Sequence, residues 1–560
     1  MIPSVPGASL FAAIRGTRSF APLRQPLFAA LWTASLVSSF GSLIQSTGAS
    51  WMMTELTNSA HMVALVQTAT ALPILMFSLL AGAIADIYER RLVMLLSLLT
   101  MMVASFALSG LAFFGLAGPW TLLVVTFVLG VGAALYSPSW QSSVAEQVSR
   151  DEMPAAVALN SLNYNLARAL GPAVGGLIVA WAGAQSAFLV NAVSYFAILF
   201  VLFRWKPAAP THSLPPENVF PAVFSGLRYA RQSPGIRIVL LRVMVFGLAG
   251  ASIWALLPFV AAHIPGGGPL TYGLLLGALG LGAITGALTI TPARHRFGNE
   301  KLARIAVLTY GLAAFGTGLF HNFYLLAVML VAAGVAWVWA LSTFNITVQM
   351  MVPRWIMGRT LSIYQMALFG GMSVGSWLWG WLADHVTPGG SLVASGGLMV
   401  LGVALAVRLQ LPVFEGLNLE PSDHWPEPSP AIDLAHEAGP IRISLEYRVK
   451  PANVPAFLDV MRRVRRMRRR DGAFTWSLLQ DMAQPEIWLE SFQVATWADH
   501  LRQQKRATMA DRAVEAAAFA LHSGPARPRI RYLIDCESQM VDAARVARDV
   551  RRASAAGYAD

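Results

Sequence analysis

In this chain of 560 residues, the charged residues inside apolar segments are the ones most suited to specific chemistry. Arg168 lies about three turns into an apolar helix expected over 154–181, too deep for its guanidinium to reach a membrane surface easily. An unpaired arginine at that depth costs at least about 2.5 kcal/mol on insertion. Its side chain must face protein or water. It is either a structural donor between helices or a cationic cavity group for an anionic or oxygen-rich substrate. Arg242, nearer the end of its helix, is predicted to be an interface anchor.

Amides and one phenol on the same apolar helices could line a cavity together with Arg168, although each one alone is more often a packed hydrogen-bonding group. These candidate cavity and substrate positions are Gln45, Gln67, Asn160, Asn163, Asn165, Asn191, Asn345, Gln349, Tyr364 and Gln365.

No Asp or Glu lies at the middle of a predicted apolar helix. A proton-driven carrier needs a titrating group within reach of both sides, and Glu55 and Asp384 at the outer helix ends are the leading candidates. The sequence contains no GxxxxGK[ST] motif, so ATP-driven transport is unsupported.

Cys536 is the single cysteine, which excludes a disulfide framework and a cysteine-ligated zinc site. We expect no metal and no cofactor.

The composition of the chain predicts the type of secondary structure that carries these residues. The chain is 56% hydrophobic and 12% charged, whereas soluble domains contain about 25% charged residues. This excludes a soluble enzyme as the main body and predicts a polytopic, α-helical membrane protein. Twelve apolar helices are expected, six on each side of a polar break at 205–235, near 27–53, 61–85, 92–115, 120–145, 154–181, 185–204, 236–261, 271–292, 301–320, 323–350, 358–384 and 391–410.

Basic residues predict the orientation of these helices. Residues 1–412 contain 20 Lys+Arg and 9 Asp+Glu, whereas residues 413–560 contain 21 and 20. Alternate loops of the membrane part hold all of its loop arginines and lysines, and the opposite loops hold none, so the basic loops are predicted to be cytoplasmic. Both termini then lie in the cytoplasm. Three arginines precede the first apolar run without a cleavage site, so we predict no removable signal peptide.

The two halves are related by an offset of about 204 residues, which is typical of a duplicated six-helix unit. Glycine-rich helices give some such matches by chance. The matched pairs include Gly82 with Gly286, Arg90 with Arg294, Arg150 with Arg354, Gly171 with Gly375, and Gly176 with Gly380.

Three stretches then resemble a known family. GAIADIYERR at 82–91 is similar to the signature between helices 2 and 3 of the major facilitator superfamily. PSWQSSVAEQV with AVALNSLNYNLARALGPAVGG, and GRTLSIYQMALFGGMSVGSWLWGWLAD, resemble its branch of transmembrane secretion effectors related to enterobactin exporters. The resemblance implies an exporter of a drug-like or siderophore-like molecule in the bacterial inner (plasma) membrane, working by alternating access and coupled to protons.

The resemblance also implies a charge latch on the cytoplasmic side, with Asp86, Arg90, Arg91 and Glu146 as its members; ordinary interfacial charges are the alternative. Ile87 and Glu89 depart from the superfamily pattern, in which a basic residue and a glycine are common. The second-half copy has Ile290 in the aspartate position, so only the first latch is expected to be electrostatically complete.

Gly171, Pro172, Gly175 and Gly176 resemble the helix 5 motif of antiporters in this superfamily. Small residues let another helix backbone approach closely, and proline bends the helix. A hinge-like interface between the halves and plain small-residue packing both remain open.

After the last apolar helix, a proline-rich acidic linker leads to a soluble module. The pattern predicts strand, helix, strand, strand, a second helix over about 496–520, and a last strand, which is the order of a ferredoxin-like α+β unit. A run of arginines at 461–470 is expected to face solvent or lipid headgroups, and nucleic acid is not an expected partner.

The sequence thus predicts the following division of the chain into segments: 1–26 cytoplasmic segment, 27–204 first half, 205–235 inter-half loop, 236–410 second half, 411–440 linker, 441–540 soluble domain and 541–560 tail.

The soluble domain resembles the antibiotic-biosynthesis monooxygenase family, whose members dimerise and need no metal or flavin. That resemblance makes Glu490, Trp497 and His500 its candidate site and allows a homodimer. Fold does not imply chemistry, and binding or association is the favoured role. We therefore predict an exporter and not an enzyme. The alternative is a membrane-tethered, cofactor-independent monooxygenase or dimerisation module carried by a transporter-like scaffold.

Overall fold

The computed structural model describes residues 18–149, 151–205, 219–413, 418–422, 432, 434–435 and 437–534. The chain divides into two compact units. The first consists of residues 1–223, 238–348 and 361–412, and the second of residues 224–237, 349–360 and 413–560. The expected segment 541–560, most of 1–26 and half of the linker lie outside the described residues.

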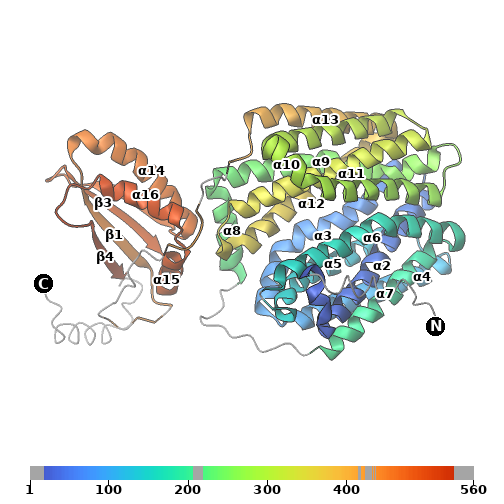
Figure 1. Ribbon diagram of the computed structural model, residues 1–560, viewed down its shortest axis with the longest axis horizontal. Helices are drawn as coiled ribbons and strands as arrows, with labels where there is room; N and C mark the ends of the chain where they lie inside the picture. Colours follow the sequence, from blue (N-terminus) through green and yellow to red (C-terminus); the bar gives the residue numbers. More distant parts are fainter. Residues whose placement is uncertain are drawn as a thin grey trace, which may run out of the picture. The chain divides into compact units, whose positions relative to one another are not determined.

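The first unit is a bundle of long helices (Figure 1). After the short 3-10 helix η1 (Arg18–Arg24), its first half contains α2 (Pro26–Leu56), α3 (Ala60–Ile87), α4 (Arg90–Phe113), α5 (Pro119–Gln147), α6 (Met153–Ala182) and α7 (Ala184–Arg204). Its second half contains α9 (Pro234–His263), α10 (Pro269–Leu319), α11 (Phe323–Met350), α12 (Met357–His385) and α13 (Pro388–Arg408).

Ten helices in the described part of the chain are long and apolar enough to cross a membrane, which agrees with a polytopic membrane protein. The helix α10 covers two of the expected spans. Gly298 interrupts it with φ 72° and ψ 167°, a conformation that glycine adopts without steric penalty. The helix α12 has the length of a span, with 29 residues, but is not among the ten. A count of twelve spans stays a prediction.

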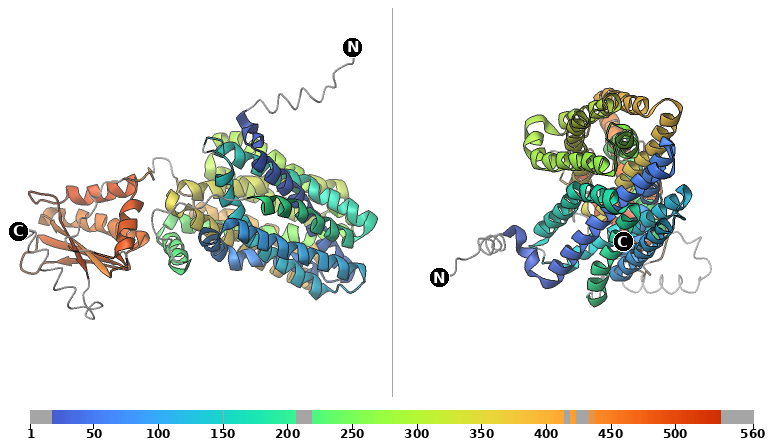
Figure 2. Two further views of the ribbon diagram at one scale, coloured as in Figure 1. Left: turned by 90° about the horizontal axis from the view of Figure 1, so that it is seen from below. Right: turned by 90° about the vertical axis from the view of Figure 1, so that its right-hand side faces the viewer.

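Within the first half, side chains of three helices form a shared apolar core. Leu31 of α2, Met94 and Leu98 of α4, and Ile198 and Leu202 of α7 are almost fully buried against one another. The further views in Figure 2 show these helices running along a common direction. Burial of this kind orders the first half as one packed body.

Glycines form the closest seam between the two halves. A Cβ atom added to Gly176 of α6 would lie 2.8 Å from the Cα of Gly273 of α10, and one added to Gly280 would lie 2.6 Å from the Cα of Ala169. The backbones of α6 and α10 are therefore in contact without intervening side chains. A second seam joins α3 and α12, where a Cβ on Gly380 would lie 3.0 Å from the Cα of His61.

The expected inter-half loop 205–235 contains a helix, α8 (Val219–Gln232), which the sequence analysis did not predict. The polar residues Arg228, Arg231 and Gln232 masked the amphipathic pattern, in which Tyr229 and Ala230 are buried. In the second unit the Tyr229 ring meets Trp355 edge to face, with centroids 5.9 Å apart. Trp355 belongs to a short 3-10 helix, η2 (Arg354–Ile356).

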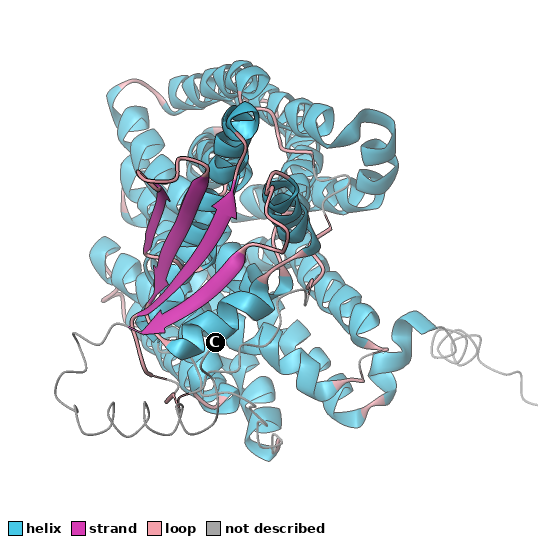
Figure 3. Cartoon of the chain, turned by 90° about the vertical axis from the view of Figure 1, so that its left-hand side faces the viewer, coloured by secondary structure: helices cyan, strands magenta, loops and turns pink. Residues whose placement is uncertain are grey.

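The rest of the second unit is an α+β domain with a four-stranded antiparallel sheet (Figure 3). The strands β1 (Ile441–Arg448), β2 (Thr475–Gln480), β3 (Ile487–Val494) and β4 (Arg529–Ile534) have the order β2-β3-β1-β4. Its helices are η3 (Pro451–Asn453), α14 (Val454–Asp471), α15 (Trp497–Arg506) and α16 (Met509–Ala520).

The alternating apolar residues of β1 pack against the apolar stripe of α14, as the sequence pattern predicts. Ile443, Leu445, Phe457 and Met461 are all at most 1% exposed. This domain therefore has a core of its own, independent of the helical bundle.

Two expectations for this domain were wrong. The single helix over 496–520 is two helices, because Thr508 starts α16 with a capping box in which its hydroxyl and the Asp511 carboxylate satisfy each other's backbone N–H groups. The arginine run does not face solvent throughout, since Arg468 is only 6% exposed. A cluster of buried carboxylates keeps this arginine inside the domain, as described below.

Candidate functional site

Arg168 lies at the centre of α6, where both halves contribute to its surroundings. Its guanidinium carbon lies 5.2 Å from the ring centroid of Tyr164, one turn earlier on α6. It lies 5.5 Å from the ring centroid of Trp254, which belongs to α9 of the second half. Within the described part of the chain no carboxylate forms an ion pair with it. The charge is thus held between aromatic faces and is not neutralised by an acid.

Trp254 belongs to a cluster of aromatic side chains that extends into the core of the second half. The Trp254 and Trp337 centroids are 5.8 Å apart, and Trp337 lies 5.6 Å from Tyr310. The Tyr310 hydroxyl donates a 2.8 Å hydrogen bond to the carbonyl of Gly250, which fixes its position. Phe246 packs 5.5 Å from the same tyrosine. Our sequence reasoning missed this cluster because tryptophan and tyrosine in apolar helices look like ordinary packing residues.

Gln45 belongs to a buried network inside the first half. Its side-chain oxygen accepts hydrogen bonds from Ser105, at 2.8 Å, and from the Asn191 amide, at 2.5 Å. Asn191 also donates to the Tyr195 hydroxyl at 3.3 Å. These groups join α2, α4 and α7, so their geometry fits structural cross-linking better than substrate contact.

The other predicted cavity residues are spread over several environments. Asn163 donates to the Trp32 carbonyl of α2 at 3.1 Å, and Tyr364 donates to the Leu341 carbonyl of α11 at 3.2 Å. Asn165 bonds within its own helix, to the Ser161 carbonyl. The structure does not gather the whole predicted set around Arg168. Gln67 and Asn160 are half-buried, and Gln365 is exposed.

The side chains of Asp86 and Glu146 lie outside the described residues, so the charge pairs of the predicted latch stay predictions. The arginines of the same signature have clear positions. Arg90 donates to the Ser142 carbonyl of α5 at 3.2 Å. Arg91 donates to the carbonyls of Leu202 and Phe203 at the end of α7, at 2.8 and 2.9 Å. Both arginines therefore hold the start of α4 against neighbouring helix ends.

The second half has a charge cluster of its own that the sequence analysis did not find. Glu300 of α10 pairs with Arg242 of α9 at 2.6 Å and with Arg304 at 2.5 Å. It also accepts the backbone N–H of Leu411 at 2.8 Å, just after α13. The anchor role predicted for Arg242 fits this geometry. The signal was the sequence GNEKLAR, in which Glu300 and Arg304 are one helical turn apart.

The glycines of the helix 5 motif, which lie on α6 of the structure, contact two different helices. A Cβ on Gly171 would lie 2.9 Å from Leu43 Cβ, and one on Gly175 would lie 3.0 Å from Ile44 Cα, both on α2 of the same half. Gly176 contacts α10 of the other half. The motif therefore supports packing inside the first half as well as the seam between the halves.

The two carboxylates proposed for proton coupling differ in their contacts. Glu55 accepts a 2.7 Å hydrogen bond from the Trp51 indole, four residues earlier on the same helix. Asp384, near the end of α12, accepts a 2.6 Å hydrogen bond from the Ser59 hydroxyl and a 3.2 Å bond from the backbone N–H of His61. Only Asp384 links helices of the two halves.

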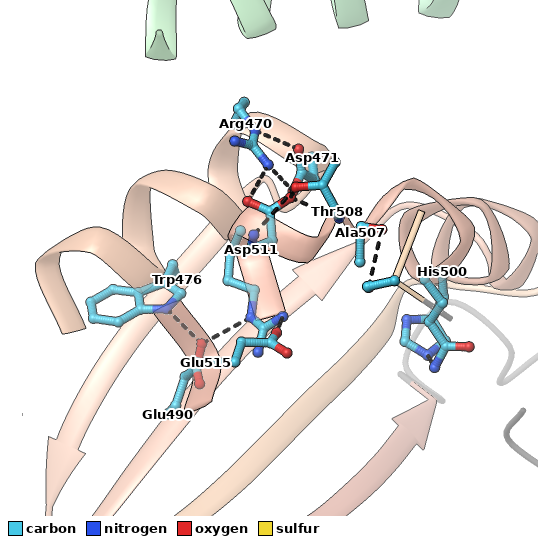
Figure 4. Close-up of polar contacts among 12 residues, drawn as sticks. Arg470, Asp471, Trp476, Glu490, His500, Ala507, Thr508, Asp511 and Glu515 are labelled. Carbon is cyan, nitrogen blue, oxygen red and sulfur yellow. Dashed lines mark hydrogen bonds and ion pairs between the residues drawn. The ribbon is translucent and has the colours of Figure 1, made fainter. Parts of the chain in front are cut away.

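In the α+β domain Glu490 is fully buried and engaged (Figure 4). It accepts hydrogen bonds from Tyr447, at 3.1 Å, from Arg468, at 3.2 Å, and from Trp476, at 3.1 Å. Arg468 also pairs with Glu515 at 2.6 Å. Both oxygens of Glu490 thus accept hydrogen bonds from side chains in the interior of the domain, a geometry that fits a structural role.

His500, the other predicted site residue of this domain, is 2% exposed. Burial, and then the nearby Arg468 charge, lower the pKa of His500 to about 4. The imidazole is therefore neutral near pH 7. Its Nε2 lies within hydrogen-bonding distance of the Gln504 amide nitrogen, at 3.1 Å. Trp497 lies 5.4 Å from its ring and is buried.

A small cavity of about 20 Å³ lies beside His500, among α14, α15, α16 and β3. Its polar lining includes Arg468, Gln503 and Asp511. This volume holds about one water molecule. In the described residues no group of three His, Cys, Asp or Glu side chains could hold a metal ion.

The fold and the charged interior define a membrane transporter of the major facilitator type. The family model of the transmembrane secretion effectors matches residues 17–540, so the chain belongs to that family. The family and its relatives are transporters and not enzymes. The match extends through the α+β domain.

Named relatives are similar over 60 to 71% of this chain. The chain is 24% identical over 338 residues to the staphyloferrin A transporter of Staphylococcus aureus, covering 60% of this chain and 84% of the relative. It is 25% identical over 416 residues to the multidrug efflux pump Tap of Mycobacterium tuberculosis, covering 71% and 96%. It is 27% identical over 398 residues to the enterobactin exporter EntS of Shigella flexneri, covering 69% and 92%.

Solved structures share the fold at low identity. The nucleoside transporter NupG matches with a TM-score of 0.55 and 12% identity, covering 68% of this chain and 98% of that one. The bacterial homologue of the human lysosomal transporter Spinster, inward-facing and unoccupied, matches with a TM-score of 0.53 and 16% identity, covering 70% and 98%.

Proposed function

We propose that this protein is a secondary active transporter that exports a small molecule across the bacterial inner membrane by alternating access. The orientation follows the basic-loop pattern, with both termini in the cytoplasm. The twelve expected spans form two six-helix halves that rock against each other.

The observation that carries this proposal is the position of Arg168. It is an arginine at the centre of α6 whose guanidinium faces Trp254 of the other half at 5.5 Å. Substrate sites of such carriers lie near the middle of the bilayer, between the repeats. A permanent charge at that place, without a described carboxylate partner, is available to an incoming ligand.

The substrate class follows from the same contacts. A guanidinium offers five donors, and the flanking aromatic rings offer flat apolar faces. This combination favours an anionic or oxygen-rich ligand with aromatic parts, such as a catecholate or hydroxamate siderophore. The relatives named for staphyloferrin A, enterobactin and multidrug efflux support both a siderophore-like and a drug-like substrate.

The α+β domain is proposed to be a ferredoxin-like module that binds or dimerises. Its strand order, with β1 between β3 and β4, supports that topology. The engaged Glu490 argues against the alternative, a membrane-tethered monooxygenase. Truncation at about residue 415 should leave an inserted carrier, and the purified domain should self-associate. A strictly monomeric domain in light scattering at high concentration would count against dimerisation.

A whole-cell accumulation screen tests the transport proposal. Cells that produce the protein are loaded with a panel of siderophores and fluorescent drugs, with and without a proton uncoupler. At least one compound should accumulate less in producing cells, and the uncoupler should abolish the difference. Cells that produce Gly176→Val, in which the seam between the halves is overfilled, serve as the matched control. Equal accumulation of every compound in all cells would contradict the proposal.

A further inference from the structure

One side of the helix α8 packs against η2 and the start of α12. The Arg359 guanidinium, in the first turn of α12, donates a 2.6 Å hydrogen bond to the Ser225 hydroxyl. One turn further along α8, the Tyr229 ring meets Trp355 edge to face, with centroids 5.9 Å apart. Ser225 and Tyr229 are both buried. These contacts fix the rotation of α8 about its axis, and thereby determine which of its residues lie on the open side.

The open side of α8 combines apolar and basic side chains. Phe224 and Leu227 are 63% and 51% exposed, and Arg231 is exposed as well. With 3.6 residues per turn, these three positions lie within about 60° of one another around the helix. Residues 219–237 contain three arginines and no Lys, Asp or Glu, which is a net charge of +3. Large apolar side chains beside arginine are typical of a helix that lies in a membrane interface.

The following helix, α9, shows where the bilayer begins. The Ser233 carbonyl accepts the N–H of Arg237 at 3.2 Å, and Pro234 starts α9, so Ser233 separates the two helices. The exposed side of α9 then changes from Arg237 to Leu241 and Met244. A change from a cation to apolar side chains indicates that the headgroup level lies near Arg237. At 1.5 Å per residue, Ser233 is about 6 Å from that level, so the end of α8 adjoins the interfacial layer.

We infer that α8 is an interfacial helix that binds an anionic phospholipid surface, with Phe224 and Leu227 among the acyl chains and Arg231 on lipid phosphate. Two features favour lipid over a protein partner. The arginines complement anionic headgroups, and one residue alone separates α8 from a membrane-spanning helix. In the proposed orientation this surface is the cytoplasmic leaflet. Because Ser225 is bonded to the start of α12, α8 would hold both α9 and α12 at that leaflet.

Fluorescence quenching in proteoliposomes tests this inference with the full chain. In a Cys536→Ser background, Leu227→Cys carries an environment-sensitive fluorophore in vesicles of phosphatidylethanolamine and phosphatidylglycerol. Met482→Cys, which is 98% exposed in the turn after β2, is the aqueous reference. Leu312→Cys, which is 58% exposed on α10, is the bilayer reference. Nitroxide-labelled lipid should quench the Leu227 label, and iodide should quench it about fivefold less than the Met482 label.

A charge reversal tests the contact with lipid phosphate. Arg231→Glu should lower nitroxide quenching of the Leu227 label about threefold in vesicles that contain phosphatidylglycerol, and should have little effect in pure phosphatidylcholine. Arg442→Glu makes the same change of charge at an exposed position of β1 and should behave like the parent. Equal quenching in Arg231→Glu and the parent would overturn the assignment of Arg231 to lipid phosphate.

Two results would overturn the inference as a whole. Iodide quenching as strong as that at Met482 would mean that the open side of α8 lies in water. Protection from both quenchers would mean that the α+β domain or a second copy of the chain covers it. None of these measurements needs a transported substrate, so failure of the transport proposal is distinguished from failure of this one.

Discussion

The guanidinium of Arg168 on α6 lies 5.5 Å from the ring of Trp254 on α9, so one charge in the bundle interior contacts both halves of the molecule. Under the proposed rocking of the halves this distance changes, so the same group would both respond to the state of the carrier and contact its ligand.

Substitutions of Arg168 separate a substrate role from a structural one. Arg168→Lys keeps the charge but loses the planar fork, and it should weaken export of an anionic substrate about tenfold. Arg168→Met should abolish that export and spare a neutral or cationic compound. Export of both compounds is measured together with the melting temperature in detergent. A uniform loss with a lower melting temperature would remove Arg168 from the binding site.

Adding one methyl group to the seam between α6 and α10 should stop the movement of the halves. Gly273→Ala places a Cβ within 2.8 Å of Gly176 Cα, and we expect loss of export with about 1–3 kcal/mol of destabilisation. Gly397→Ala on α13, where no atom lies within 4 Å of the new Cβ, is the matched control and should retain full activity. Normal export by Gly273→Ala would mean that the seam separates easily.

Glu300→Gln should strongly destabilise the second half. The change leaves Arg242 without its ion-pair partner, and loss of one member of a buried pair costs about 3–5 kcal/mol. Because Glu300 is 23% exposed, the lower end of that range is expected. The double variant Arg242→Met/Glu300→Leu should recover part of the loss. Thermal unfolding in detergent, followed by tryptophan fluorescence, measures both; equal melting temperatures for Glu300→Gln and the parent would contradict the assignment.

Asp86→Asn tests the cytoplasmic latch. If Asp86 and Arg90 help to hold the inner side shut, the variant should shift toward inward-facing states and export more slowly, with normal insertion. Transport rate and accessibility of a cytoplasmic cysteine are the measurements. Unchanged values for both would show that Arg90 acts only through its bond to the Ser142 carbonyl.

The α+β domain should lose stability as the pH falls from about 6.5 to about 4. Folding keeps His500 neutral with a pKa of about 4, whereas the unfolded chain takes up a proton near pH 6.5. The unfolded state therefore binds more protons in this window, and acid favours it. The loss should approach about 3 kcal/mol in urea unfolding of the purified domain. His500→Gln should remove most of this slope; an equal slope in that variant would assign it to the buried carboxylates.

Helix positions in the bundle, and the order of strands and helices along the small domain, were largely predictable, because apolar runs and alternating patterns extend over many residues. Contacts between distant helices were not. Glu300 and Arg242 are 58 residues apart, and nothing local in the sequence indicates that they pair. Arg468 appeared to belong to a solvated arginine run, since its carboxylate partners Glu490 and Glu515 come from β3 and α16.

The bare contact between Gly176 and Gly273 limits how this protein can evolve. Under the proposed alternating access, two helix backbones in direct contact could slide past each other without separating interlocked side chains. The same surface tolerates no added methyl group on either side. Substitutions that change substrate preference are therefore expected to accumulate around Trp254 and Tyr164, while Gly176 and Gly273 are retained.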